Sequence, residues 1–221
     1  MTRVKICGLT RAADLAVAVE AGADAVGLIA GVTVETPREI DFETAADLAT
    51  GVPPFVDSVL VTMPEGAGEA RERIERTGVD AVQVHGLTPE AVASLAGDGT
   101  DVIAAVGPTD PDIDAYAAAA DALLVDSIDG DGGGGTGETH DWEAAGALAE
   151  DLDTPVVLAG GLGPETVGEA VETARPYAVD VASGIEGDDG TKDAEKVQAF
   201  VQRVRAADAR AADTESPEVE Q

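Results

Sequence analysis

The sequence predicts an α/β protein with a single (β/α)8 barrel (a TIM barrel) over residues 1–206. Eight short runs rich in Val, Ile, Leu and Ala alternate with eight longer stretches rich in Ala, Glu and Asp. The spacing is roughly 26 residues per unit, which suits a barrel of this kind. The short runs are apolar on both faces, as parallel strands covered by helices are. An open doubly wound sheet also alternates strands and helices, but eight units without a spare strand favour the closed barrel.

The strands are predicted where β-branched and aliphatic residues cluster between turn residues. The second strand, for example, follows the turn signal Ala21-Gly22-Ala23-Asp24. In chain order the expected strands are 4–8, 25–29, 55–61, 81–85, 102–106, 122–126, 155–159 and 178–182.

The helices are predicted from N-cap residues and from the Pro and Gly residues that bound them. Thr10, Asp41 and Thr88 are good N-caps, and Pro89-Glu90 after Thr88 fits a helix start. The helix after the fourth strand therefore begins at Thr88. The other expected helices are 10–21, 42–49, 65–76, 110–119, 141–150, 164–173 and 193–206. Residues 207–221 carry little apolar content and are expected to form an acidic, disordered tail.

The charge is strongly acidic, with 44 Asp and Glu against 13 Lys and Arg and a formal net charge of −31. This charge repels nucleic acids and anionic membranes, so neither is an expected partner. The carboxylates are spread along the chain, and only three basic residues are lysines. We therefore expect a protein from a salt-adapted organism, where salt screens self-repulsion. The alternative is an ordinary acidic bacterial protein.

The sequence also bears on cellular location, on disulfide bonds and on metal or cofactor sites. The chain lacks the roughly 20 apolar residues of a membrane span and the apolar stretch of a secretory signal, which predicts a cytoplasmic protein. One cysteine excludes an internal disulfide framework and a multi-cysteine metal site. No metal-binding or nucleotide motif occurs, so we expect no metal and no cofactor.

Catalytic groups in a (β/α)8 barrel lie where the strands end. Cys7 ends the first strand and Asp126 ends the sixth, so they face each other across the barrel mouth. Such a pair can act as base and acid on opposite sides of a substrate. Lys5 points to the same side as Cys7 and is expected to lower the thiol pKa. A lone cysteine is more often a small core residue, and His85 is either a hydrogen-bonded mouth residue or a substrate contact.

Glycine-rich loops follow the sixth, seventh and eighth strands. Gly160-Gly161 and Ser183-Gly184 occupy the usual phosphate position of these barrels, where backbone N–H groups approach the ligand closely. The sixth loop contains Gly135 and Gly137. Any one loop alone fits a tight turn equally well, but the three together favour phosphate binding.

With these residues the chain resembles the phosphoribosylanthranilate isomerase family of tryptophan biosynthesis. The matching motifs, in the family's order, are Lys5-Ile6-Cys7-Gly8, Thr36-Pro37-Arg38, Gln83-Val84-His85-Gly86, Leu124-Val125-Asp126, Gly134-Gly135-Thr136-Gly137 with Asp141-Trp142, Leu158-Ala159-Gly160-Gly161-Leu162, and Ala182-Ser183-Gly184-Ile185-Glu186 leading to Gly190-Thr191-Lys192-Asp193. The resemblance implies an Amadori rearrangement without a cofactor. Cys7 would be the general base, Asp126 the general acid, and Arg38 the partner of the anthranilate carboxylate.

The substrate is then a small phosphosugar–anthranilate, and the protein a monomer or homodimer. The remaining substrate-binding candidates are Lys5, His85, Gly135, Gly137 and Asp180. Two other classes stay open at this point. One is another phosphate-binding barrel enzyme, such as indole-glycerol-phosphate synthase or triosephosphate isomerase, which use other residue pairs. The other is a barrel that binds a phosphosugar without turnover.

Overall fold

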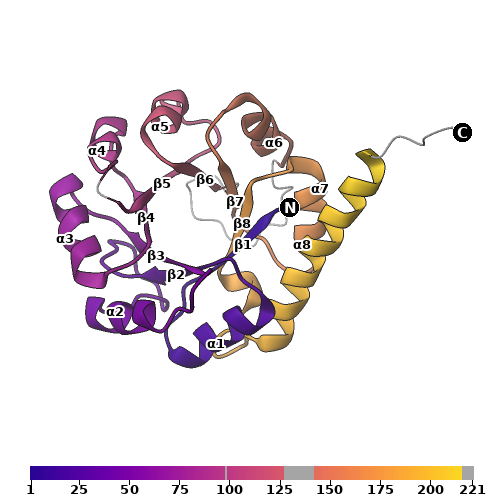
Figure 1. Ribbon diagram of the computed structural model, residues 1–221, viewed down its shortest axis with the longest axis horizontal. Helices are drawn as coiled ribbons and strands as arrows, with labels where there is room; N and C mark the ends of the chain where they lie inside the picture. The colour runs from indigo at the N-terminus through magenta and orange to yellow at the C-terminus, as the bar shows by residue number, and fades with distance from the viewer. Residues whose placement is uncertain (98, 127–141, 216–221) are drawn as a thin grey trace, which may run out of the picture.

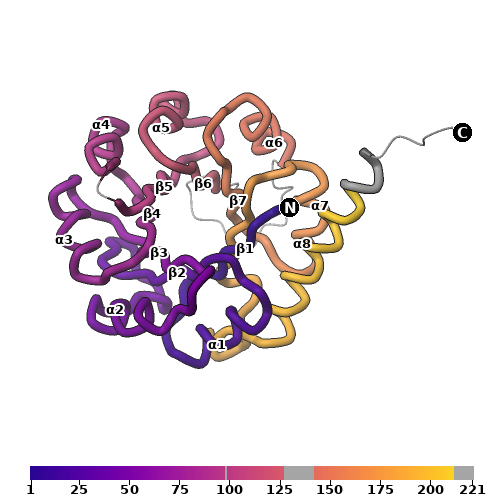
Figure 2. Tube along the Cα trace, viewed as in Figure 1, coloured from indigo at the N-terminus to yellow at the C-terminus, as the bar shows by residue number. Residues whose placement is uncertain are grey.

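The predicted barrel is confirmed. The computed structural model describes residues 1–97, 99–126 and 142–215. All neighbouring strands are parallel, and they close into a ring in chain order (Figures 1 and 2). The strands are β1 (Arg3–Cys7), β2 (Ala25–Ile29), β3 (Asp57–Thr62), β4 (Ala81–His85), β5 (Asp101–Val106), β6 (Ala122–Asp126), β7 (Val156–Ala159) and β8 (Ala178–Val181).

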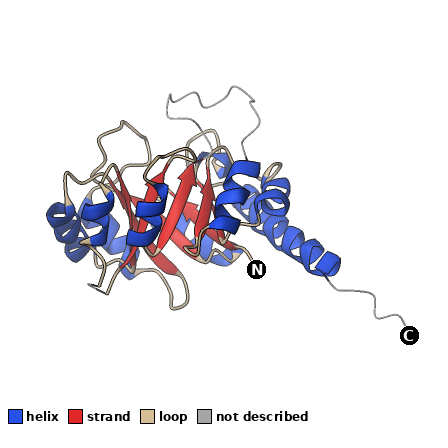
Figure 3. Cartoon of the chain, turned by 90° about the horizontal axis from the view of Figure 1, so that it is seen from above, coloured by secondary structure: helices blue, strands red, loops and turns tan. Residues whose placement is uncertain are grey.

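The helices surround the ring of strands, as the side view in Figure 3 also shows. They are α1 (Ala12–Ala21), α2 (Phe42–Thr50), α3 (Ala67–Thr77), α4 (Pro89–Ala93), α5 (Ile113–Ala119), α6 (Trp142–Asp151), α7 (Val167–Ala174) and α8 (Ala194–Glu215), with a short 3-10 turn η1 (Ser183–Ile185) after β8. Among the described residues, no helix is both long and apolar enough to span a bilayer.

The helix caps were predicted with mixed success. Asp41 accepts a hydrogen bond from the Thr44 N–H, and Thr88 accepts one from the Ala91 N–H, so both N-caps are confirmed. Thr10 is not an N-cap, because α1 begins one residue later and its capping position is Arg11. The hydroxyl of Thr10 instead bonds the carboxylate of Asp14, in the first turn of α1.

Phe55 does not belong to the third strand, contrary to the prediction. Its φ of 74° lies in the left-handed region, and its side chain is fully exposed. The preceding Pro53 and Pro54 lack a backbone N–H and so cannot extend a strand. The strand therefore starts at Asp57, two residues after Phe55.

The main hydrophobic core lies between the ring of strands and the helices. Residues that point outward from the strands are almost fully buried there, including Ile6, Leu28, Leu60, Val82, Leu123, Leu158 and Val179. Each such side chain contributes about 1.5–3 kcal/mol relative to an exposed one. This core holds the eight strands in register and so fixes the positions of the strand ends.

Inside the barrel, inward-pointing residues form layers of four that come from alternate strands. The strand registers define four complete layers from bottom to top: Ala25, Ala81, Ala122 and Ala178; then Lys5, Val59, Ile103 and Val157; then Gly27, Gln83, Leu124 and Asp180; then Cys7, Val61, Ala105 and Ala159. His85 and Asp126 lie one layer higher, at the mouth. The polar side chains of Lys5, Gln83 and Asp180 thus lie in the two middle layers, beneath Cys7.

Three aspartates bind the starts of strands at the opposite end of the barrel. The carboxylate of Asp24 accepts a hydrogen bond from the Val4 N–H, that of Asp80 from the Ser58 N–H and that of Asp121 from the Val102 N–H, each at 2.8 Å. Each aspartate stands just before an even-numbered strand and binds the start of the preceding odd-numbered one. A hydrogen bond to a charged group contributes about 1.5–3 kcal/mol, less where water competes.

The last helix is longer than predicted. It continues past Ala206 to Glu215, and Ala207 is fully buried. The carboxylate of Asp208 accepts hydrogen bonds from the backbone N–H and the hydroxyl of Thr2. The expectation of a tail beginning at residue 207 is therefore wrong, because this turn of the helix covers the start of β1.

Candidate active site

Cys7 lies at the carboxyl end of β1, on the inner face of the barrel, and is buried. Gly27 of β2 makes room for it, since a Cβ at Gly27 would come within 2.6 Å of the Cys7 Sγ. The neighbouring strand thus has to carry glycine at this level. The thiol therefore lies in the barrel interior near the mouth, and not in the outer core between strands and helices.

A row of hydrogen bonds runs beneath the thiol. The Nζ of Lys5 donates to Gln83 Oε1 at 2.9 Å and to Asp180 Oδ1 at 3.0 Å, linking β1 to β4 and β8. Burial by itself would lower the pKa of Lys5, but Asp180 and Cys7 raise it above its usual value. Lys5 is therefore a buried cation in contact with two acidic groups.

The thiol is less acidic than the sequence analysis expected. Burial raises the pKa of Cys7; Lys5 lowers it, and the Asp180 carboxylate raises it further. The net shift is upward, although Lys5 acts on the thiol pKa in the expected direction. Desolvation outweighs the effect of Lys5.

His85 is a neutral imidazole at the top of the same row. Burial lowers its pKa, and the nearby Lys5 cation lowers it further. Its Nε2 lies 3.0 Å from the Gln83 Nε2. Because Gln83 uses its oxygen for Lys5, its amide nitrogen donates to His85, which places the imidazole proton on Nδ1. His85 is thus a hydrogen-bonded mouth residue whose Nδ1–H remains a possible donor to a ligand.

Asp126 stands at the carboxyl end of β6 and is exposed. It pairs in register with Ala159, and β6 is three strands from β1 around the ring. The fold thus places Cys7 and Asp126 on opposite sides of the mouth, with the thiol one layer deeper. A substrate lying between them presents one face to each group.

Arg38 reaches across the mouth from the loop after β2. Its aliphatic stem passes over Gly8, where a Cβ would come within 2.7 Å of the Arg38 Cδ, and Gly8 has a φ of +74°. The guanidinium then meets Glu186, which follows β8, through Nε–Oε1 at 2.7 Å and Nη2–Oε2 at 2.8 Å. Arg38 is therefore fixed above the end of β1, close to Cys7.

The two loops predicted to bind phosphate touch each other. A Cβ at Gly184 would come within 2.0 Å of the Leu162 carbonyl oxygen, so only glycine fits there. Gly160 and Gly161 have φ values of 92° and 58°, which favour glycine as well. Ser183 and Gly184 are exposed at the mouth. These loops after β7 and β8 form one surface of closely packed backbone.

Two predicted residues, Gly135 and Gly137, lie outside the described residues. Within the described ones, no cluster of three or more His, Cys, Asp or Glu side chains has a metal-binding arrangement.

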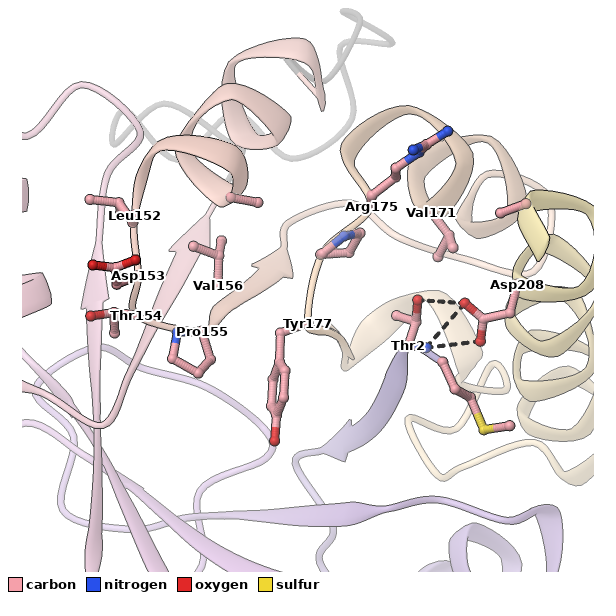
Figure 4. Close-up of a pocket in the computed structure, with 14 residues that line it drawn as sticks. Thr2, Leu152, Asp153, Thr154, Pro155, Val156, Val171, Arg175, Tyr177 and Asp208 are labelled. Atoms are coloured by element: carbon pink, nitrogen blue, oxygen red, sulfur yellow. Dashed lines mark hydrogen bonds between the residues drawn. The ribbon is translucent and has the colours of Figure 1, made fainter. Parts of the chain in front are cut away.

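Two pockets lie at the other end of the barrel. One of about 480 Å³ lies between β7, β8 and the helices and is lined by Thr2, Pro155, Arg175, Tyr177 and Asp208, among others (Figure 4). A smaller one lies inside the bottom of the barrel and includes Lys5 and Asp57. Neither pocket is lined by Cys7, Arg38 or Asp126, which lie at the mouth of the barrel.

Three residues of the site were not predicted as functional. Gln83 connects Lys5 to His85, and Lys192 donates to Glu186 at 2.8 Å. All three stood in or beside the quoted motifs. The contact between Lys5 and Gln83 joins residues 78 positions apart, which no local pattern reveals.

Comparisons with known proteins agree with this geometry. A family model described as "PRAI: N-(5'phosphoribosyl)anthranilate (PRA) isomerase" matches residues 4–203. The chain is 58% identical over 209 residues to the N-(5'-phosphoribosyl)anthranilate isomerase of Haloarcula marismortui, covering 94% of this chain and 98% of that one. It is 58% identical over 204 residues to that of Natronomonas pharaonis, covering 91% and 97%.

Solved structures show the same fold. The phosphoribosyl anthranilate isomerase of Thermotoga maritima superposes with a TM-score of 0.82 at 33% identity, covering 93% of this chain and all of that one. A phosphoribosyl anthranilate isomerase in complex with reduced 1-(o-carboxyphenylamino)-1-deoxyribulose 5-phosphate gives 0.78 at 32% identity, with the same coverage.

Proposed function

The chain belongs to the N-(5'-phosphoribosyl)anthranilate isomerase family, and from this membership we propose that Cys7 and Asp126 are its catalytic base and acid. The protein is an isomerase of tryptophan biosynthesis. It converts N-(5'-phosphoribosyl)anthranilate into 1-(2-carboxyphenylamino)-1-deoxyribulose 5-phosphate by an Amadori rearrangement. Relatives from halophilic archaea confirm the prediction of a salt-adapted source.

Asp126 carries the first step of the proposed mechanism. As a carboxylic acid it protonates the ring oxygen of the ribose, and the bond from that oxygen to C1 breaks. The electron pair of the anthranilate nitrogen forms a C1–N iminium, which holds the positive charge. An exposed carboxyl at the end of β6 supports this role, because it can reach a ligand in the mouth.

Cys7 carries the second step. The iminium makes the C2 hydrogen acidic, and the thiolate removes this proton to leave an enolamine. The enolamine takes up a proton at C1 and loses the proton of its C2 hydroxyl, which leaves the ketone at C2. Burial favours the neutral thiol, and the Lys5 cation beside it favours the thiolate that this step requires. Proton transfer by a positioned group contributes roughly 10²–10⁴ in rate.

The two anionic ends of the substrate need separate partners. We place the phosphate on the loops after β7 and β8, at the backbone N–H groups of Gly160, Gly161, Ser183 and Gly184. Close packing of these loops supports this assignment. The anthranilate carboxylate then lies against Arg38, whose guanidinium geometry suits a bidentate pair.

The observation that carries the proposal is the placement of Cys7 and Asp126 on opposite sides of one mouth. The test is loss of anthranilate-linked fluorescence when the purified chain meets its substrate in molar salt. We expect turnover with inorganic phosphate as a competitive inhibitor. A Gly184→Ala chain should lose phosphate inhibition first, because its Cβ displaces the loop after β7. Binding without turnover would contradict the enzymatic assignment.

The partner and location predictions extend this function. The substrate is a small phosphorylated molecule, and we propose the cytoplasm, where amino-acid biosynthesis takes place. A Thermotoga maritima relative is described as dimeric. For this chain both the monomer and the homodimer stay predictions, which light scattering in molar salt separates.

A further inference from the structure

Arg38 binds Glu186 with one edge of its guanidinium. The Nε and one Nη2 hydrogen form two parallel bonds with the two carboxylate oxygens. A guanidinium has five N–H donors, so this pairing leaves both Nη1 hydrogens and the second Nη2 hydrogen. Within the part of the chain that the structure describes, no protein acceptor takes them. The remaining Nη1–Nη2 edge has the geometry for a second bidentate carboxylate.

Glu186 is itself held from a second side. The Nζ of Lys192 donates to its Oε1 at 2.8 Å and to the Ala182 carbonyl oxygen at 2.9 Å. The Glu186 side chain is 9% exposed and that of Lys192 is 1% exposed. Burial alone would raise the pKa of Glu186, but the bonds from Arg38 and Lys192 hold it below its usual value. Glu186 is therefore an anion fixed between two cations.

We propose that Glu186 is a positioning residue, which fixes the Arg38 guanidinium so that its Nη1–Nη2 edge receives the substrate carboxylate. This inference rests on the proposed role of Arg38. Glu186 follows η1, whose residues belong to the proposed phosphate loop. One residue therefore connects the two anion-binding ends of the mouth and sets the distance between them.

A second consequence concerns charge. Without Glu186, Arg38 and Lys192 would be two cations beside each other at the mouth of a barrel. Glu186 cancels one of these charges and keeps the arginine extended over Gly8. The substrate carboxylate then meets a guanidinium already in place, and little conformational freedom is lost on binding.

The experiment compares Glu186→Gln with Arg38→Ala and with the double variant. The glutamine keeps the shape but presents an amide NH2 to one guanidinium N–H. We expect kcat/KM to fall by roughly 10- to 100-fold, since small errors in position cost that much. The loss should appear mainly in KM, while the Ki of inorganic phosphate stays unchanged. In the Arg38→Ala background, Glu186→Gln should have no further effect on KM.

Glu172→Gln is the matched control. Glu172 pairs with Arg210 between α7 and α8, at an exposed position far from the mouth. The same chemical change there should alter neither KM nor kcat. A Lys192→Met background provides the second control, in which Glu186→Gln should still raise KM.

The outcomes separate the two proposals. If Arg38→Ala leaves KM unchanged, the role of Arg38 is wrong and the inference falls with it. If Arg38→Ala raises KM but Glu186→Gln does not, only the inference is overturned. The inference is also overturned if Glu186→Gln weakens the binding of phosphate as much as that of substrate. It is overturned as well if the effect of Glu186→Gln on KM persists in the Arg38→Ala background and disappears in the Lys192→Met background. Either result would mark a structural or lysine-mediated role.

Discussion

Carboxylates have different partners at the two ends of this barrel. At the mouth, Glu186 binds Arg38 and Lys192, and beneath the mouth Asp180 binds Lys5. At the opposite end, Asp24, Asp80 and Asp121 bind backbone N–H groups at the starts of strands, and Asp24 also pairs with Arg205. Both sets are partly buried and accept short hydrogen bonds. Among the described residues, Glu186 holds two cations at the mouth of a protein whose net charge is −31.

This difference shows how a strongly acidic chain still binds an anion. Arg38 and Lys192 are fixed at the mouth by Glu186, and Lys5 is fixed beneath it by Asp180. The bottom of the barrel carries the aspartates that hold strands in place. Changes at the mouth should therefore affect catalysis more than stability, and changes at the bottom should do the reverse.

The largest effect is expected for the catalytic pair. Asp126→Asn and Cys7→Ser should each lower kcat by roughly 10²–10⁴-fold, because the amide is a poor proton donor and the hydroxyl a poor base. Product binding and the melting temperature should change little. Steady-state kinetics measures kcat, and calorimetry measures product binding and the melting temperature. Near-normal kcat in either variant would remove that residue from the mechanism.

Arg38→Ala should have the next largest effect. Loss of the charged partner of a desolvated carboxylate costs on the order of 2–5 kcal/mol in kcat/KM. Inorganic phosphate should remain a competitive inhibitor of similar strength. Weaker phosphate inhibition with unchanged affinity for anthranilate analogues would mean that the substrate lies the other way round.

At the bottom of the barrel, Asp80→Ala should lower stability without changing kcat/KM. The Ser58 N–H and hydroxyl lose their acceptor, and Ser58 is buried, so the cost is about 1–3 kcal/mol. Denaturant titration measures the loss. Asp47→Ala removes the same charge from an exposed position on α2 and serves as the control. A catalytic defect in Asp80→Ala would break the contrast between the two ends.

Salt should affect the whole molecule. The screening length falls from about 10 Å at 0.1 M to about 3 Å at 1 M, so self-repulsion of the acidic surface weakens. The melting temperature should rise between these concentrations. Equal melting temperatures would show that the acidic surface does not limit stability.

The smallest expected effect is a change in thiol reactivity. Because burial raises the pKa of Cys7, its alkylation by iodoacetamide should reach half its maximal rate above pH 8.5, roughly the pKa of a free thiol. Lys5→Met should shift this midpoint upward and Asp180→Asn should shift it downward, since the two charges act on the thiol in opposite directions. Shifts of the same sign would contradict the charge assignment.

The two ends also differ in what the sequence reveals. Cys7, His85 and Asp126 were predicted because they stand at strand ends, which the apolar runs locate. Contacts between distant segments were not predictable: Glu186 meets Arg38 across 148 residues, and Asp208 meets Thr2 across 206. The end of α8 was missed for the same reason, since Ala207 is buried only once β1 lies beside it.

The energetic balance at Cys7 was also beyond the sequence. Lys5 two residues away suggested a lowered thiol pKa, but burial decides the sign, and burial depends on the closed barrel. Local patterns thus predict which residues form the site, and the tertiary structure determines their protonation.

The most direct test is a crystal structure of this chain with a reduced analogue of its product, grown in molar salt. We expect the phosphate on the loops after β7 and β8 and the carboxylate on the Nη1–Nη2 edge of Arg38. We also expect the sugar chain between Cys7 and Asp126, with the two residues on opposite faces. A ligand bound in the reverse direction, or with neither residue in contact with the sugar, would contradict this expectation.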